Sequence, residues 1–176
     1  MNNKGTGGNE HNNSEKENNL NTISEDDKNA VNEKLIKLEE YLQELKDYKP
    51  DSFKNYISHK KVKYSVERLL QLIIDLALDI NNIIIKSQGG YPASDYFNSF
   101  IDLVEFDVFN DEFAQKIAPS TGIRNRLVHE YEKINDKIVY NSIDKTINYY
   151  TKYMKNIIKY LAKVSDISNN INNKKG

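Results

Sequence analysis

The chain contains 176 residues and no cysteine, and its formal net charge at neutral pH is -1. This length predicts one domain with enough residues to bury a sizeable core. The lack of cysteine excludes disulfides and thiolate metal sites. Nucleic-acid-binding proteins usually carry a basic surplus, so a near-neutral chain would have to bind RNA through a local patch of positive charge.

The two ends of the chain differ in composition from its middle. Residues 1–23 are rich in Asn, Gly, Glu and Ser and contain few large apolar side chains, so they cannot bury enough surface to offset the entropy of ordering. We therefore expect disordered tails at residues 1–23 and 166–176 and a folded domain at residues 24–165. No secretory signal is expected, because the N-terminus lacks a basic start followed by an apolar run. No membrane span is expected either, because Asp75 and Asp79 interrupt the most apolar stretch. A cytoplasmic location fits this pattern.

The first half of the domain has the apolar spacing of helices. Residues 31–45 place valine or leucine at steps of four, three, four and three positions, which makes one apolar stripe. Ser24 is a suitable N-cap for this helix, and Pro50 ends it. A second helix is expected to start within residues 51–59 and to continue to about Ser87. Its middle is apolar on more than one face, which predicts the central, most buried helix.

Turn and cap residues divide the second half of the domain. Glycines at positions 89 and 90 predict a stop. We expect a helix over residues 94–106, a short segment from Asn110 or Asp111 to 117, a new start at Ser120 after Pro119, and a last helix over 142–164. No convincing pair of strands is present. Short helical connections of this kind predict an all-α fold, an antiparallel up-and-down bundle of four to five helices.

The segment GIRNRLVHEYEKIN, residues 122–135, gathers side chains suited to chemistry on a phosphate. His129 can exchange a proton near neutral pH, and Arg124 can hold a phosphate through two hydrogen bonds. Asn125 lies four residues before His129 and shares a helical face with it. These groups would suffice to cleave RNA without a metal. By spacing alone an ordinary alternative is favoured, in which the histidine complements the helix dipole and the arginines pair with surface glutamates.

The same segment resembles the signature of the HEPN superfamily. RNRLVHEY, residues 124–131, has an Arg, four further residues, a His, one residue and a Tyr, which is the form found in HepT-like toxins that pair with a minimal nucleotidyltransferase antitoxin. SVERLLQLIIDLALDINNIII, residues 65–85, looks like the family's long helix. YPASDYFNSFIDLVEFDVFNDEFAQKI, residues 91–117, is similar to its middle segment. The resemblance covers residues 25–165.

The resemblance implies roles for individual residues. Arg124 and His129 would be the catalytic pair of an endoribonuclease that uses no metal and no cofactor, and Asn125 matches the polar residue that commonly follows the Arg. Tyr131 matches the tyrosine that the transferase partner modifies with AMP, which silences the toxin. Asp79 matches an acidic residue on the central helix. It would orient Arg124 or His129, or alternatively cap a buried polar pocket.

The resemblance also implies a homodimer in which two copies of the motif face each other and form one composite cleft for RNA. Such a dimer would double the local positive charge, which reconciles RNA binding with a net charge close to zero. No membrane partner is expected. Two other functions stay open from the sequence. One is a catalytically inactive HEPN binding module that docks a nucleotidyltransferase, and the other is a helical scaffold without activity.

Overall fold

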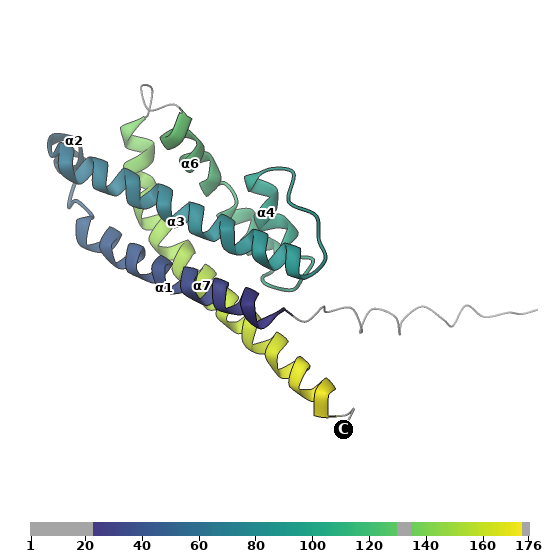
Figure 1. Ribbon diagram of the computed structural model, residues 1–176. Helices are drawn as coiled ribbons and strands as arrows, with labels where there is room; N and C mark the ends of the chain where they lie inside the picture. Colours follow the sequence, from purple (N-terminus) through teal and green to yellow (C-terminus); the bar gives the residue numbers. More distant parts are fainter. Residues whose placement is uncertain (1–22, 130–134, 174–176) are drawn as a thin grey trace, which may run out of the picture.

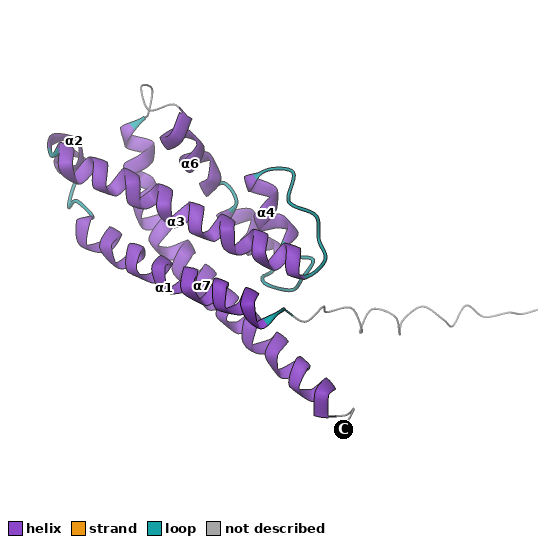
Figure 2. Ribbon diagram, in the orientation of Figure 1, coloured by secondary structure: helices purple, strands orange, loops and turns teal. Residues whose placement is uncertain are grey.

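The structure is a computed structural model that describes residues 23–129 and 135–173. Within these ranges it contains helices and no strand (Figures 1 and 2), so the predicted all-α class is confirmed. The helices are α1 (Glu25–Tyr48), α2 (Phe53–Ser58), α3 (Lys60–Ser87), α4 (Tyr96–Asp102), α5 (Asp111–Ile117), α6 (Ser120–His129) and α7 (Asp136–Asn173). The long helices α1, α3 and α7, together with α6, run in alternating directions along the bundle (Figure 1).

Helix α3 is the centre of the bundle, as its apolar pattern predicts. It contacts α1, α2, α4, α6 and α7, and eleven of its residues are buried. The predicted stripe of α1 is also buried and faces this core: Val31, Leu35, Leu38, Leu42 and Leu45. No helix in the described parts of the chain is long and apolar enough to cross a membrane.

A buried polar layer fixes α4 and α7 against α3. The Asn81 side chain donates from Nδ2 to Oγ of Ser99 on α4 (3.2 Å). The same side chain accepts at Oδ1 from the Tyr153 hydroxyl on α7 (2.7 Å). Burial raises the pKa of the Tyr153 hydroxyl well above its ordinary value, so this group stays a hydrogen-bond donor at neutral pH. The layer therefore holds three helices in one relative position.

Several helix boundaries follow from local chemistry. Ser24 caps α1 by accepting a hydrogen bond from the backbone N–H of Asp27 (3.1 Å), and Asn110 caps α5 by accepting from that of Phe113 (2.9 Å). Gly89 has a φ of 77° just after α3, a conformation that glycine adopts without steric cost. The predicted starts of α1 and α5 and the predicted stop of α3 are therefore confirmed.

Other boundaries differ from the prediction. The second expected helix is divided into α2 and α3, and together with the short α4 and α5 this gives seven helices in the described ranges. Helix α7 begins at Asp136 because Oδ1 of Asn135 accepts from the backbone N–H of Lys137 (3.1 Å).

The predicted tails also need correction. Helix α7 continues to Asn173, so residues 166–173, which we expected in the C-terminal tail, are helical. Ile23, expected in the N-terminal tail, is only 3% exposed and belongs to the core. The other residues of the two expected tails, 1–22 and 174–176, lie outside the described residues.

Candidate active site on helix α6

Helix α6 takes its position from a break in the chain just before it. Pro119 has no backbone N–H and cannot continue the hydrogen bonding of α5, and across this turn the N–H of Thr121 donates to the carbonyl oxygen of Ala118 (3.1 Å). The Thr121 side chain is buried, and Ile123 and Leu127 pack against the core. The inward face of α6 is thus apolar, and its polar residues are left on the other faces.

Arg124 is held by a carboxylate of the central helix. Its Nε donates to Oδ1 of Asp75 at 2.7 Å, and the two side chains are 15% and 32% exposed. Gln71 on α3 donates from Nε2 to Oδ2 of the same carboxylate (3.4 Å) and accepts from Nη1 of Arg68 (3.0 Å). Among the described residues no group accepts from the terminal nitrogens of Arg124. These nitrogens are therefore available to bind a phosphate.

The face of the Arg124 guanidinium is covered by Tyr96, the first residue of α4. The guanidinium carbon lies 4.9 Å from the centre of the Tyr96 ring, within the range of cation–π attraction. Helix α4 is fixed at this end because Asp95 accepts from the backbone N–H of Asn98 (2.8 Å). The direction of Arg124 is thus set by three helices, through its own backbone, the Asp75 carboxylate and the Tyr96 ring.

Asn125 and His129, the other predicted site residues of α6, lie on its exposed surface. Neither side chain has a hydrogen-bond or ion-pair partner within the described part of the chain. Five helical positions separate Arg124 from His129, which turns their directions apart by about 140°. The imidazole and the guanidinium of one chain therefore project from different sides of α6. Tyr131, the predicted modification site, lies outside the described residues.

The prediction for Asp79 requires a correction. Its carboxylate accepts a hydrogen bond from Nζ of Lys34 on α1 at 2.8 Å and is 57% exposed, so it neither contacts Arg124 nor caps a buried polar pocket. The acid that contacts Arg124 is Asp75, four residues earlier on α3. The physical reason is the packing of α6 against α3, which places Arg124 beside Asp75, whereas Asp79 pairs with α1.

A hydrogen bond below the surface joins the start of α6 to α7. The hydroxyl oxygens of Ser120 and Tyr150 lie 2.7 Å apart, and Tyr150 is fully buried. Burial raises the pKa of the Tyr150 hydroxyl well above its ordinary value; the hydrogen bond with Ser120 opposes this shift, and the Asp75 carboxylate adds to it. The hydroxyl stays protonated at neutral pH and attaches α6 to the core one turn before Arg124.

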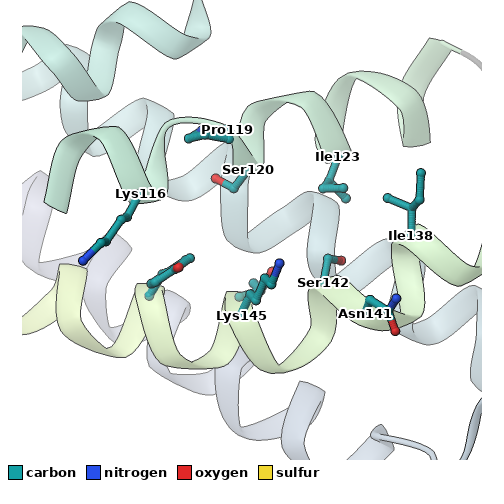
Figure 3. A pocket seen from close by; sticks show the side chains of 10 residues that line it. Lys116, Pro119, Ser120, Ile123, Ile138, Asn141, Ser142 and Lys145 are labelled. Atoms are coloured by element: carbon teal, nitrogen blue, oxygen red, sulfur yellow. The ribbon is translucent and has the colours of Figure 1, made fainter. Parts of the chain in front are cut away.

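A hollow of about 410 Å³ opens beside α6, between α5 and α7 (Figure 3). Lys116 is paired with Glu112 (2.5 Å), whereas Lys145 has no ion-pair partner among the described residues. None of the lining residues is acidic, and they combine lysines, hydroxyl and amide groups and apolar side chains: Lys116, Pro119, Ser120, Ile123, Ile138, Asn141, Ser142, Lys145, Thr146 and Tyr149. Helix α6 contributes Ser120 and Ile123 to this lining, and the exposed site residues Asn125 and His129 are not part of it.

The arrangement offers one group to bind a phosphate and one to move a proton. Arg124 is oriented and partly buried, and His129 is exposed at the end of the same helix. Within the described ranges no group of three or more His, Asp or Glu side chains is placed to hold a metal ion. The site is therefore built from a cation and an imidazole on one helix, supported by Asp75 and Tyr96.

Comparison with known proteins identifies the family. A family model described as "Ribonuclease HepT-like" matches residues 38–157. The chain belongs to the HepT-like ribonuclease family. A relative from Aphanizomenon flos-aquae (strain 2012/KM1/D3), named tRNA nuclease HepT, is 36% identical over 126 residues, which are 72% of this chain and 86% of the relative. The matched region contains Asp75, Tyr96, Arg124, His129 and Tyr131.

Solved structures of toxins have the same fold as this HepT-like chain. A tri-AMPylated Shewanella oneidensis HEPN toxin in complex with an MNT antitoxin superposes with a TM-score of 0.67 at 19% identity, covering 73% of this chain and 96% of that one. A toxin–antitoxin crystallised with AMP-PNP gives a TM-score of 0.67 at 19% identity and covers 74% and 98% of the two chains. At this level of identity the likeness establishes the shared all-α fold.

The sequence did not single out Asp75 or Tyr96 as site residues. Asp75 was noted only because it interrupts the apolar stretch, and Tyr96 lies within the segment that resembles the middle part of the family. Both contact Arg124 from elements that are distant in the chain. An acidic residue and an aromatic residue on helix surfaces give no local signal of such a contact.

Proposed function

We propose that this chain is the toxin of a toxin–antitoxin pair, an endoribonuclease that cleaves RNA without a metal ion. The observation that carries the proposal is the setting of Arg124, which is held at Nε by Asp75 and on one face by Tyr96, while no described residue accepts from its terminal nitrogens. An arginine oriented in this way is preorganised to stabilise charge on a phosphate. The match to the ribonuclease family over residues 38–157 supports the same reaction class.

The proposed reaction uses the ribose 2′-hydroxyl as the nucleophile. His129 accepts the 2′-hydroxyl proton as a general base, and the 2′-oxygen forms a bond to the phosphorus. The bond from phosphorus to the 5′-oxygen breaks, and the leaving oxygen takes up a proton from a general acid. Arg124 binds the phosphate oxygens while negative charge accumulates there. The products are a 2′,3′-cyclic phosphate end and a 5′-hydroxyl end.

The active form is proposed to be a homodimer. Arg124 and His129 of one chain project from different sides of α6, so a single copy does not direct both groups at one phosphate by itself. Two copies that face each other across α6 would place the guanidinium and imidazole groups of both chains around one cleft. Asn125, exposed on the same helix, would then be available to orient the phosphate or the imidazole.

The control of the toxin is proposed to depend on Tyr131 and a minimal nucleotidyltransferase partner. The Tyr131 hydroxyl oxygen would attack the α-phosphorus of ATP and release pyrophosphate, which leaves AMP on the tyrosine. Tyr131 follows His129 by two residues, so the added phosphate and nucleoside would occupy space close to the imidazole. An AMP group at this position would therefore exclude the RNA.

The function is tested by incubating the purified protein with RNA in the presence of EDTA. Transfer RNA is the first substrate to use, since the Aphanizomenon relative is named a tRNA nuclease. Cleavage should persist in EDTA and disappear in Arg124→Ala and His129→Ala. Arg126→Ala is the matched control, because Arg126 is an exposed arginine on the same helix, and it should retain cleavage. Equal cleavage by all four proteins would show that a contaminating nuclease is responsible.

The second candidate function is a binding module that presents Tyr131 to a nucleotidyltransferase without cleaving RNA. It is favoured by the lack of an orienting partner for His129 within the described residues. Mass spectrometry after coexpression with the transferase should find AMP on the wild-type protein and not on Tyr131→Phe. Modification without any RNA cleavage would support the binding module over the nuclease. Equal modification of Tyr131→Phe would contradict the assignment of the tyrosine.

A further inference from the structure

Three aromatic side chains lie on the surface around the start of α4, and we call Tyr91, Tyr96 and Phe97 the α4 aromatic surface. Their exposed fractions are 90%, 42% and 38%. Aromatic residues are enriched at binding surfaces relative to the rest of a protein surface. One of the three, Tyr96, also contacts Arg124, which joins this surface to the candidate active site.

The exposure of these rings does not result from a poorly packed helix. Phe100, one turn after Tyr96 on α4, is fully buried and packs edge-on against the rings of Tyr150 and Tyr153. Helix α4 thus has a well-packed inner side at Phe100, whereas Tyr96 and Phe97, one turn earlier at the start of the helix, are 42% and 38% exposed. No aromatic pair within the described residues involves Tyr96, whose ring contact is the Arg124 guanidinium.

We infer that Tyr96 binds an unpaired nucleobase of the RNA substrate, in the nucleotide next to the phosphate that Arg124 holds. This inference rests on the proposed ribonuclease function. Single-stranded nucleic acids are bound by aromatic rings on which bases stack, together with a cation for the backbone. Here the cation and the ring are already in contact, with 4.9 Å between the Arg124 guanidinium carbon and the ring centre. A phosphate on Arg124 therefore brings the base of the same or the adjoining nucleotide to Tyr96.

The charge of the segment favours a base over the phosphate backbone as the occupant. Residues 91–106 contain no lysine or arginine and include three acids, Asp95, Asp102 and Glu105. Proximity to other acids adds to the effect of burial in raising the pKa of Asp102, which reflects a local excess of negative charge. Such a segment would repel a tract of phosphates. It offers an aromatic ring to a neutral base, while Arg124, which the ring contacts, supplies positive charge for the phosphate.

The binding test uses the fact that the chain contains no tryptophan. In Tyr96→Trp the new indole is the only one in the protein, so its fluorescence reports on that position alone. The probe is a single-stranded 2′-O-methyl oligonucleotide, which the proposed reaction cannot cleave because the 2′-oxygen is blocked. Tyr48→Trp is the matched control, since Tyr48 is 48% exposed at the end of α1.

The oligonucleotide should quench Tyr96→Trp to saturation and leave Tyr48→Trp unchanged. An oligonucleotide with abasic positions should quench far less, and inorganic polyphosphate should not quench. No quenching, or equal quenching by the abasic oligonucleotide, would overturn the inference. A spectral change of Tyr96→Trp with protein concentration alone, without RNA, would also overturn it, because the occupant would then be a second copy of the chain.

The activity test separates this inference from the proposed function. Tyr96→Ala should reduce kcat/KM on RNA by about tenfold through a higher KM, the loss expected for one stacked base, and Tyr96→Phe should restore it. On RNA with an abasic nucleotide beside the cleaved bond, Tyr96→Ala should lose less relative to wild type than on intact RNA, because only the contribution of the ring to the direction of Arg124 remains to be lost. If the loss in Tyr96→Ala is the same on abasic RNA, the ring only positions Arg124 and the inference is wrong. If wild type cleaves no RNA, the proposed function fails instead, and the fluorescence result still decides whether a base binds.

Discussion

The contact between Asp75 and Arg124 is the most specific structural element of the proposed site, and Asp75→Asn tests it. The substitution keeps the shape of the side chain and an oxygen that can accept from Nε of Arg124, but it removes the negative charge. The hydrogen bond of 2.7 Å would no longer be part of an ion pair, because only the guanidinium would still carry a charge. We expect Arg124 to lose its fixed direction.

The magnitude follows from the burial of the pair. Exposed ion pairs contribute about 0–1 kcal/mol, whereas breaking a buried pair costs about 3–5 kcal/mol. Arg124 and Asp75 are 15% and 32% exposed, between these limits, so Asp75→Asn should lower the free energy of unfolding by about 1–2 kcal/mol. Misplacing a group that binds the transition state costs about a hundredfold in rate, which is the expected loss in kcat/KM.

Asp79→Asn is the matched control for this experiment. Asp79 is on the same helix and its exposed carboxylate pairs with Lys34 at 2.8 Å, so the variant should change stability by less than about 1 kcal/mol and leave RNA cleavage unchanged. The measurements are initial rates on RNA and urea unfolding. In the Arg124→Ala background, Asp75→Asn should cause no further loss of activity. Wild-type activity in Asp75→Asn, or equal losses in the two Asn variants, would refute the positioning role.

Three further predictions concern the fold that supports the site. A Cβ at Gly90 would lie 2.8 Å from Cγ2 and 2.9 Å from the carbonyl oxygen of Ile85, whereas a Cβ at Gly122 meets nothing within 4 Å. In urea unfolding, Gly90→Ala should therefore destabilise the protein by about 1–3 kcal/mol. Gly122→Ala should stabilise it by about 0.5–1 kcal/mol. Equal effects would contradict this packing. Tyr153→Phe removes the donor to Oδ1 of Asn81 and should cost about 1–3 kcal/mol in thermal unfolding, and a neutral result would mean that Asn81 finds another donor. Burial raises the pKa of Glu67 above its ordinary 4.5, so the carboxyl binds a proton more tightly in the folded protein than in the unfolded chain, and wild-type stability should fall as pH rises above about 4.5. Glu67→Gln should lack this part of the pH dependence of stability. Parallel pH profiles of the two proteins would contradict the prediction.

Local features of the sequence were sufficient to predict most of the fold. The apolar stripe of α1, the caps at Ser24 and Asn110 and the glycine stop after α3 each depend on residues within one or two helical turns of each other. The start of α7 at Asp136, earlier than the predicted residue 142, could not be predicted because an Asn-Asp pair is typical of turns as well as of helix N-caps, and here the asparagine side chain caps the helix. The same chemistry serves both structures, so only the tertiary arrangement decides between them.

The candidate site could be predicted only in part, for a related reason. Arg124, Asn125 and His129 lie on one short helix, and their spacing is visible in the sequence. The partners of Arg124 depend on where α6 packs against α3 and on where α4 begins, which no local pattern encodes. Asp75 and Asp79 are both acids on α3, four residues apart, and the packing of α1 and α6 assigns one to Lys34 and the other to Arg124.

The most direct test of the account is the cleavage of one RNA with and without the 2′-hydroxyl at the cleaved nucleotide. In EDTA, the protein should cut the all-ribose strand and leave a 2′,3′-cyclic phosphate, identified by mass spectrometry. It should leave the strand with the single 2′-deoxy substitution intact at that position. Cleavage of the 2′-deoxy strand at the same rate, or loss of all cleavage in EDTA, would contradict a metal-independent reaction in which Arg124 and His129 assist attack by the ribose.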